Sequence, residues 1–399
     1  MAHKRVAGLL LLVAGAVSFE HPLSPHSEWR NRRPALSPKR APHRLPERGR
    51  DREVSRPSES APSLEAQWAP SSASPARSVL RTAAPIVTKS GLHDPVGSVQ
   101  GLITRLLGAS YVASFTLETI PVDPTGGLDV FELDWDSQNN RPLIRGSAGY
   151  AIASGLNWYL KYTVNASFVW GRDGSGNQLS SVPAAGSQFP RPATLRMVSA
   201  VSFRYAYNVC TYGYTMAFWN TQQFYEEIDR LALWGVNLPL AFQAQEATED
   251  RVYRAAPFSM NSSEINAYLA GPAFLPWQRM GNMRAWGGPL SPNWHVQQKA
   301  MQVLLINRMR SFGMVPVLAG FAGHVPDALE THFPNSSFTH SSDWCGFDPK
   351  LYGADTLLEA TDPLFQTLGS AMNAATLADF GDPTGLETPI FNADASTSI

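Results

Sequence analysis

The chain contains little cysteine and little charge. Two of its 399 residues are cysteine, which excludes a disulfide-stapled scaffold and a four-cysteine zinc site. Charged residues make up 16% of the chain, against roughly 25% in an average soluble domain, and the formal net charge is −1. Because a polyanion binder carries a strong excess of lysine and arginine, this balance excludes generic nucleic-acid binding.

Several functional motifs are also missing. No spacing of Cys, His, Asp and Glu indicates a metal site, no glycine-rich loop indicates phosphate binding, and no G-x-S-x-G sequence indicates a serine nucleophile. Beyond the N-terminal region, no run approaches the roughly 20 apolar residues that span a bilayer. We therefore expect no metal, no organic cofactor and no membrane span.

Aromatic residues are plentiful, with 11 Trp, 12 Tyr and 19 Phe. An aromatic-rich, charge-poor chain is typical of an apolar cleft or a carbohydrate site, although a large core gives the same composition. The length is about twice the common domain size of roughly 100–200 residues. It leaves room for one large α/β barrel or for two or three smaller domains.

The N-terminal region has the composition of a targeting segment. A basic start, a short apolar run and small residues near Ala16 predict a signal peptide over residues 1–18. Residues 19–92 are rich in Pro, Ser and Arg and have no apolar periodicity, which predicts a disordered linker. Both features favour the secretory pathway, with the lysosome, the vacuole or the exterior as destination. Three glycosylation acceptor sequences fit this route, at Asn165, Asn261 and Asn335.

A small α/β domain is expected over residues 93–192. Apolar residues recur at helical spacing from Val99 to Leu107, strand-like alternation follows over 114–117 and 129–133, and a second helix is expected over 148–161. A short strand is expected over 167–170. The prolines at 190 and 192 separate this unit from the rest.

From residue 193 to residue 399 the pattern changes to alternating strands and helices. A helix over 224–234, a glycine and the apolar strand 236–242 are followed by a helix over 295–311, a glycine and the apolar strand 315–321. This repeat is the β/α unit of a TIM-type barrel, in which chemistry occupies the loops after the strands. Three such loops carry polar residues: 208–214, 243–246 and 322–326.

Each of these loops leaves two interpretations open. Cys210 is either a packed thiol or a pocket residue. Glu246 is placed for acid–base chemistry or, as a helix N-terminal carboxylate, for the helix dipole. His324 either makes a local hydrogen bond or acts in the site. The tryptophans of the long excursion 271–294 either floor a sugar site or form an interface core.

Long segments over residues 200–370 follow one another in a fixed order. They are Arg204–Tyr214, Glu227–Leu238, Gln245–Ala247, Glu264–Leu275, Arg279–Asn282 and Arg310–Pro326. They resemble the catalytic barrel of the α-N-acetylglucosaminidases, glycoside hydrolase family 89, and residues 94–190 resemble that family's small N-terminal domain. The resemblance implies a retaining exo-glycosidase that removes terminal α-linked N-acetylglucosamine, from heparan sulfate in lysosomes. It implies sugar contacts for Asn208, Cys210, Tyr214, Trp277, Trp344, Glu246 and His324.

The catalytic carboxyls are harder to place. A retaining glycosidase needs two of them about 5–5.5 Å apart. In the family the acid is a Glu closing a strand whose start Phe391–Asp394 resembles, and Ser398 falls where that Glu belongs. Tyr352–Glu359 also fits the motif in part, but chain order favours Phe391–Asp394, so Glu359 is a minor candidate. The nucleophile position falls after the last residue.

The sequence therefore predicts an α/β protein with a small N-terminal α/β domain followed by an incomplete TIM-type (β/α)8 barrel. Because an open half barrel exposes strand edges, we expect a fragment of the enzyme. The alternative is a truncated, non-catalytic sugar-binding relative. The expected partner is a glycan with terminal α-N-acetylglucosamine, and the sequence does not fix the oligomeric state.

Overall fold

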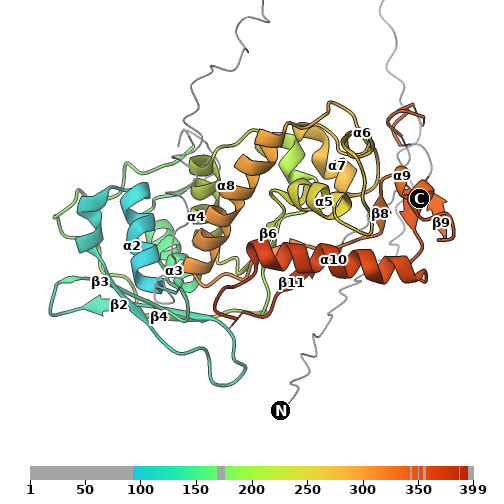
Figure 1. The fold of residues 1–399 in the computed structure, drawn as a ribbon. Coiled ribbons are helices and arrows are strands. Elements are labelled where there is room, and N and C mark those ends of the chain that lie inside the picture. The colour runs from blue at the N-terminus through green and yellow to red at the C-terminus, as the bar shows by residue number, and fades with distance from the viewer. Residues whose placement is uncertain are drawn as a thin grey trace, which may run out of the picture. The chain divides into compact units, whose positions relative to one another are not determined.

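The computed structural model describes residues 93–168, 176–341, 344–348, 350–353, 356–385 and 387–393 (Figure 1). The predicted signal peptide, the predicted linker and Ser398 lie outside these residues. Among the helices described, none is long and apolar enough to cross a membrane.

The first domain is built on a four-stranded mixed sheet. Its strands are β1 (Thr116–Thr119), β2 (Val130–Asp136), β3 (Arg141–Gly146) and β4 (Leu195–Val198), in the order β1-β3-β2-β4. β1 is parallel to β3, and β2 is antiparallel to both of its neighbours. β4 lies after the predicted boundary at residue 192, so the sheet of this domain reaches further along the chain than that boundary. Of the strand expected over 167–170, residues 169 and 170 lie outside the described residues, and Ser167 forms a single bridge.

Helices α2 (Pro95–Leu106) and α3 (Gly149–Tyr162) cover one side of this sheet (Figure 1). α2 begins with Pro95 after Asp94, whose side chain accepts a hydrogen bond from the Gly97 amide at 2.8 Å. α3 buries its apolar face against the sheet, as the sequence predicts. The short 3₁₀ helix η3 (Ala109–Ser114) connects α2 to β1.

The second domain holds four parallel strands, β5 (Tyr205–Ala206), β6 (Leu238–Ala241), β7 (Val317–Ala319) and β11 (Ile390–Asn392), in the order β11-β7-β6-β5. α4 (Thr221–Leu233) lies between β5 and β6, α8 (Pro292–Ser311) precedes β7, and α10 (Pro363–Phe380) precedes β11. Strand order that follows chain order, with a helix in each connection, confirms the β/α barrel units. The described residues thus form a small α/β domain and part of a TIM-type barrel.

Local sequence signals set the ends of the barrel helices. Asn220 and Gln223 form a reciprocal capping box at the start of α4, and Ser291 caps α8 through the Trp294 amide. Gly235 and Gly313 follow these helices with φ angles of +73° and +84°. Glycine adopts this left-handed backbone without a Cβ penalty, so the chain reverses directly into the next strand.

Two long excursions leave the barrel at the strand ends. After β6 come α5 (Gln245–Arg254), α6 (Ser262–Asn266), η5 (Pro272–Phe274) and α7 (Leu275–Arg279). After β7 comes a small antiparallel sheet, β8 (His324–Val325), β10 (Thr356–Leu358) and β9 (Phe338–His340), with α9 (Ala328–His332) inserted. The π-helix η4 (Tyr212–Met216) follows β5.

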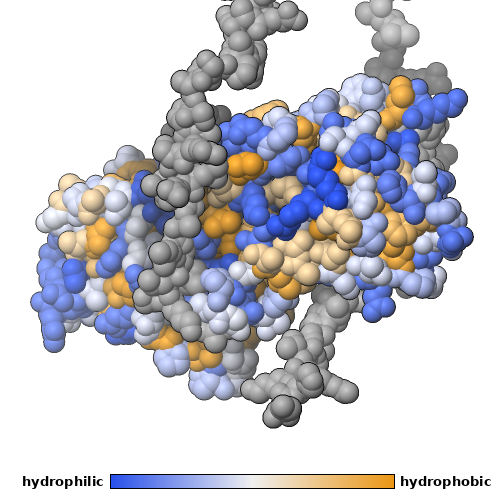
Figure 2. Space-filling view, viewed as in Figure 1, coloured by the Kyte–Doolittle hydropathy of each residue, from blue (hydrophilic) through white to orange (hydrophobic). Residues whose placement is uncertain are grey.

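The exposed side of α10 carries little charge. Asp379 is the single charged residue of this 18-residue helix. Figure 2 shows mostly pale and orange surface where α10 lies in Figure 1.

Candidate functional site

The loops after β5, β6 and β7 and the end of β11 meet at one end of the barrel sheet. They enclose a cavity of about 10 Å³, here called the strand-end cavity, whose lining residues are Val209, Phe242, Gln245, Arg279, Gly320, Ala322 and Asn392. The Asn392 amide nitrogen donates a hydrogen bond to the Tyr205 hydroxyl at 3.0 Å, which links the sheet's two outer strands. Residues that follow different strands of the sheet therefore line one cavity.

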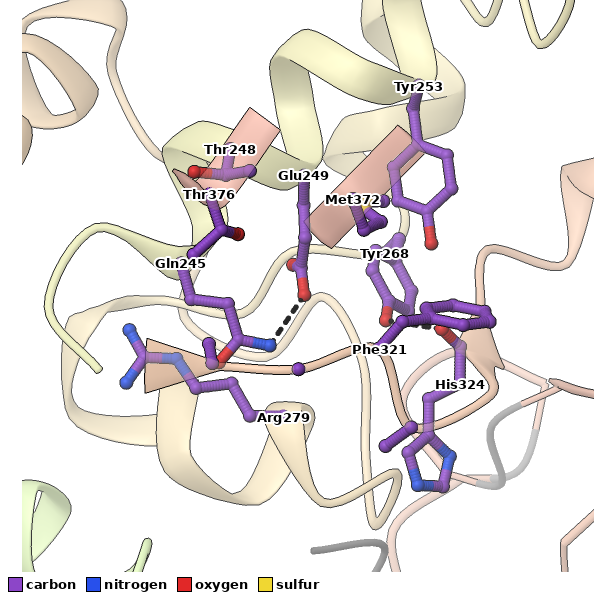
Figure 3. A pocket seen from close by; sticks show the side chains of 13 residues that line it. Gln245, Thr248, Glu249, Tyr253, Tyr268, Arg279, Phe321, His324, Met372 and Thr376 are labelled. Carbon is purple, nitrogen blue, oxygen red and sulfur yellow. Dashed lines mark hydrogen bonds between the residues drawn. The ribbon is translucent and has the colours of Figure 1, made fainter. Parts of the chain in front are cut away.

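A second cavity of about 30 Å³, here called the α5–α10 cavity, shares Gln245, Arg279, Gly320 and Ala322 with the first (Figure 3). Both α5 and α10 supply lining residues. The wall carries buried polar side chains together with aromatic and aliphatic ones, so it is a mixed polar and apolar space.

Glu249 points into the α5–α10 cavity, between Gln245 and Tyr253 (Figure 3). The Gln245 amide nitrogen donates to one of its carboxylate oxygens at 2.9 Å, and the other oxygen has no hydrogen-bond partner among the described residues. Burial raises the pKa of Glu249 to about 7. Sequence reasoning missed this residue, although the four-residue spacing from Gln245 on a helix was a usable signal.

His324 is also buried, with 5% of its surface exposed. Its backbone carbonyl accepts a bond from the Tyr268 hydroxyl at 3.3 Å, but neither ring nitrogen has a partner among the described residues. Burial lowers the pKa of His324 to about 4, so the ring is neutral above that pH. The structure therefore does not support the interpretation that the ring satisfies a local hydrogen bond.

The backbone at Gly281 approaches the His324 ring closely. Its φ angle is +76°, and a Cβ at this position would lie 2.0 Å from the imidazole. The loop after α7 can therefore approach the ring this closely only with glycine at residue 281.

The carboxylate of Glu246 accepts hydrogen bonds from other side chains of the protein. It is 1% exposed, and its carboxylate accepts hydrogen bonds from Arg279 Nη2 at 2.7 Å and from Trp294 Nε1 at 2.9 Å. It lies in the first turn of α5, where the helix dipole favours an anion. Of the two interpretations left open by the sequence, the geometry supports the structural one: Glu246 positions Arg279 and lines neither cavity.

Asn208 and Cys210 lie directly after β5. The Asn208 side-chain oxygen accepts bonds from the Thr211 amide at 3.0 Å and from the Thr211 hydroxyl at 2.7 Å. Cys210 Sγ lies 3.6 Å from Met280 Sδ, and the half-buried side chain packs against the core. The turn is thus ordered and places Cys210 beside the α7 segment.

Three aromatic residues predicted for the pocket wall are brought together. The Tyr214 and Trp277 ring centres are 5.6 Å apart at 89°, and those of Trp277 and Trp344 are 6.4 Å apart at 35°. Gly213 permits this arrangement, because a Cβ there would lie 2.3 Å from the Trp277 ring. Residues distant in the sequence therefore share one aromatic wall.

The remaining candidates lie elsewhere. Glu359 follows β10, and its amide donates to the Ser337 carbonyl at 3.0 Å within the small antiparallel sheet, so it lines neither cavity. Asn165, Asn261 and Asn335 are exposed. Within the described ranges, no three His, Cys, Asp or Glu side chains are grouped to hold a metal ion.

Two domain models of one protein family match successive parts of the chain. The alpha-N-acetylglucosaminidase (NAGLU) N-terminal domain matches residues 97–191, and the TIM-barrel domain of the same family matches residues 204–397. Human alpha-N-acetylglucosaminidase is 38% identical over 290 residues, which are 71% of this chain and 37% of the human protein.

Solved structures give the same result. The family 89 glycoside hydrolase of Clostridium perfringens, in complex with its substrate GlcNAc-α-1,4-galactose, superposes with a TM-score of 0.64 at 31% identity. The same enzyme in complex with 2-acetamido-1,2-dideoxynojirimycin gives the same values. In both cases the match covers 72% of this chain and 31% of the bacterial chain, so this chain spans about a third of these relatives.

Proposed function

Because the chain belongs to the α-N-acetylglucosaminidase family, glycoside hydrolase family 89, we propose that it acts on glycans that end in α-linked N-acetylglucosamine and removes that sugar with retention of configuration. The aromatic wall of Tyr214, Trp277 and Trp344, which come from the segments after β5, β6 and β7, is the observation that carries the proposal. A pyranose has an apolar face, which packs on such rings while its hydroxyls meet polar groups nearby.

In this proposal the described residues bind the sugar. Asn208 and Cys210 contact it from the turn after β5, and the aromatic wall covers one face. His324, with ring nitrogens that no described residue bonds, supports the site from the loop after β7. Glu246 contributes indirectly, because it holds the Arg279 side chain beside the strand-end cavity.

Hydrolysis requires two carboxyl groups about 5–5.5 Å apart on either side of the glycosidic bond. Glu246 is already bonded by two donors, and Glu359 directly follows β10 and lines neither cavity. We therefore assign neither to the reaction.

A second candidate function is sugar binding without hydrolysis. It is favoured by Ser398, which stands where the family motif has its acid. A serine hydroxyl does not supply the proton that a carboxylic acid gives to the leaving group.

We further propose a heparan-sulfate-type glycan as substrate and a secretory route to the lysosome. The human relative's family and the composition of residues 1–92 support this assignment. Glycans attached at the exposed Asn165, Asn261 and Asn335 would be consistent with that route.

The test is a titration of the purified chain with N-acetylglucosamine and with 2-acetamido-1,2-dideoxynojirimycin, followed by incubation with a nitrophenyl α-N-acetylglucosaminide. Binding that Trp277→Phe weakens at least threefold, while Trp234→Phe at the end of α4 does not, supports the site. Release of nitrophenol supports hydrolysis, and binding without release supports the second candidate. Absence of binding in a folded chain rejects both.

A further inference from the structure

The turn that follows α3 holds one of the three glycosylation acceptor sequences, Asn165-Ala166-Ser167. The flanking Val164 and Ala166 are buried, with 4% and 1% of their surface exposed, whereas Asn165 is exposed. The Ala166 amide donates to the Leu160 carbonyl at 2.8 Å, which ties this turn to the end of the helix. The backbone is therefore anchored on both sides of an asparagine that is open to solvent.

The backbone conformation explains part of this sequence. Asn165 has a φ angle of +59°, and asparagine is one of the few residues that adopt this left-handed conformation readily. That explains an asparagine at position 165. It explains neither the serine two positions later, which completes the acceptor sequence, nor the exposed aromatic ring three positions earlier.

This ring belongs to Tyr162, the last residue of α3, which is 58% exposed. It packs on Trp158, with ring centres 4.5 Å apart at 49°, and the Lys161 ammonium lies 5.2 Å from its centre. Trp158 in turn lies 5.9 Å from Phe131, and both of these rings pack against the core. The Tyr162 ring is thus supported from the protein side while most of its surface stays uncovered.

A glycan on Asn165 would begin close to this ring. Three positions of the chain span at most about 10 Å, a distance that the first sugars of an N-linked glycan bridge. These sugars are N-acetylglucosamine, a pyranose whose apolar face packs on aromatic rings. Because the glycan is covalently attached, its effective concentration at the ring is high, so a weak contact is sufficient to hold it there.

We propose that Asn165 carries an N-linked glycan and that the first sugars of this glycan pack on the Tyr162 ring, which stabilises the first domain. Attachment forms a bond between Asn165 Nδ2 and C1 of the first N-acetylglucosamine of a lipid-linked oligosaccharide. The bond from that carbon to the lipid diphosphate breaks, the diphosphate leaves with the electron pair, and the amide loses one proton. The inference rests on the secretory route proposed above and is independent of the sugar site at the strand ends.

The first measurement is peptide mass spectrometry on the full chain, produced in a secreting eukaryotic cell. A glycan on Asn165 is the expected result. Glycans on Asn261 or Asn335 without one on Asn165 overturn the inference and leave the secretory route standing. Three unmodified asparagines overturn both.

The second measurement is the thermal midpoint of chains from the same cells. All of them carry Ser263→Ala and Ser337→Ala, which remove the other two acceptor sequences. Asn165→Asp removes the acceptor amide with a residue that also tolerates the left-handed backbone. It should lower the midpoint by about 2–4 °C when Tyr162 is present and leave it unchanged in Tyr162→Ala. Tyr162→Phe keeps the ring and should behave as the wild type.

The control is the same set of chains from a bacterial host without N-glycosylation, in which the two substitutions should act additively. Equal losses with and without the Tyr162 ring in the glycosylated chains overturn the packing. A coupling that also appears in the bacterial chains overturns it, because residues 162 and 165 then interact without a sugar. If circular dichroism shows that Tyr162→Ala is unfolded, Tyr162→Gln decides, since it keeps a long side chain without a ring.

Discussion

Two glutamates three positions apart on α5 are buried in different ways. Glu246 is matched by the Arg279 guanidinium and the Trp294 indole, whereas Glu249 is bonded by the neutral Gln245 amide alone. Burial raises the pKa of Glu249, because the charged form loses its contact with water. The same residue type therefore has two different electrostatic roles within one helix turn.

Glu249→Gln is expected to change stability in a pH-dependent way. The pKa of this carboxyl rises from 4.5 to about 7 in the folded chain, so the unfolded chain ionises first. The wild type then loses stability as the pH rises from about 4.5 to 7. The variant should match the wild type at pH 4.5 and exceed its free energy of unfolding by about 3 kcal/mol at pH 8.

Urea unfolding of both chains at the two pH values measures this difference. Two nearby charged groups, Arg279 and Glu246, are present in both proteins, as is His324, whose lowered pKa gives the opposite dependence. Their contributions cancel in the comparison. An equal shift at pH 4.5 and pH 8 would show that Glu249 is not the titrating group.

Glu246→Gln should be much more damaging. The substitution leaves the Arg279 charge, whose side chain is 4% exposed, without an anion inside the protein. Removing one partner of a buried ion pair costs about 3–5 kcal/mol. Glu118→Gln, which breaks the exposed pair with Arg145, should cost less than about 1 kcal/mol. Denaturant midpoints of the two variants give the comparison, and similar losses would contradict it.

At this scale the sequence located residues better than it assigned their roles. Tyr214, Trp277 and Trp344 were each predicted to contact the sugar, and their rings lie next to one another. The role of Glu246 depends on Arg279 and Trp294, which reach it from two later segments, and no local pattern reveals such a pairing. For Glu249 the spacing from Gln245 was a local signal, but its burial also depends on α10, more than a hundred positions away along the chain.

Among the elements, β5 combines a short ladder with a charge-assisted anchor. It has two residues, and Ala206 pairs with Pro239, which has no amide hydrogen to donate. Just before it, Arg204 donates to the Asp129 carboxylate at 2.6 Å, which also accepts from Tyr150 and Ser147 at 2.9 Å each. The start of the barrel is therefore held by the first domain.

Asp129→Asn should loosen the segment that follows β5. Loss of the charge-assisted bonds to Arg204 is expected to cost about 2 kcal/mol and to raise amide hydrogen exchange over 205–216 while leaving β6 and β7 protected. The control is Asp123→Asn, which pairs with the exposed Arg196 at 3.2 Å. Exchange that rises equally in all strands would indicate general destabilisation instead.

The longer helices were predicted within a few residues, as α3, α4 and α8 show. Strands β8, β9 and β10 were not, because two or three residues carry no periodicity. Their pairing is decided by contacts between segments on either side of α9. Secondary structure of this size follows from tertiary packing and not from local sequence.

Across the whole described molecule, one hydrophobic cluster runs from the first domain into the barrel. The Ser98 hydroxyl donates to the Ser311 carbonyl at 2.7 Å, and the Tyr150 amide donates to the Phe312 carbonyl at 3.1 Å. The end of α8 thus docks directly on α2 and α3. The prolines at 190 and 192 predicted two separate units, but the structure shows one hydrophobic core that both domains share.

Gly149→Ala tests this docking. A Cβ at Gly149 would lie 2.9 Å from the Phe312 carbonyl oxygen, so the domains must move apart, with an expected loss of about 2 kcal/mol. Gly101→Ala on α2 is the matched control, because its nearest neighbour is the flexible Arg105 side chain and alanine favours the helix. Thermal midpoints should fall for the first variant and hold or rise for the second. An unchanged thermal midpoint in Gly149→Ala would show that the interface accommodates a Cβ without loss of stability.

The hydrogen bonds around Asp129 also bear on the order in which parts of the chain fold. β2 and β3 are neighbours along the chain and pair locally, whereas β6 must wait for four helices before β7 can join it. Synthesis proceeds from the N-terminus, so the ribosome releases Asp129, Ser147 and Tyr150 well before Arg204. The first domain is then in place before β5 is released, and Arg204 bonds to an Asp129 that is already positioned.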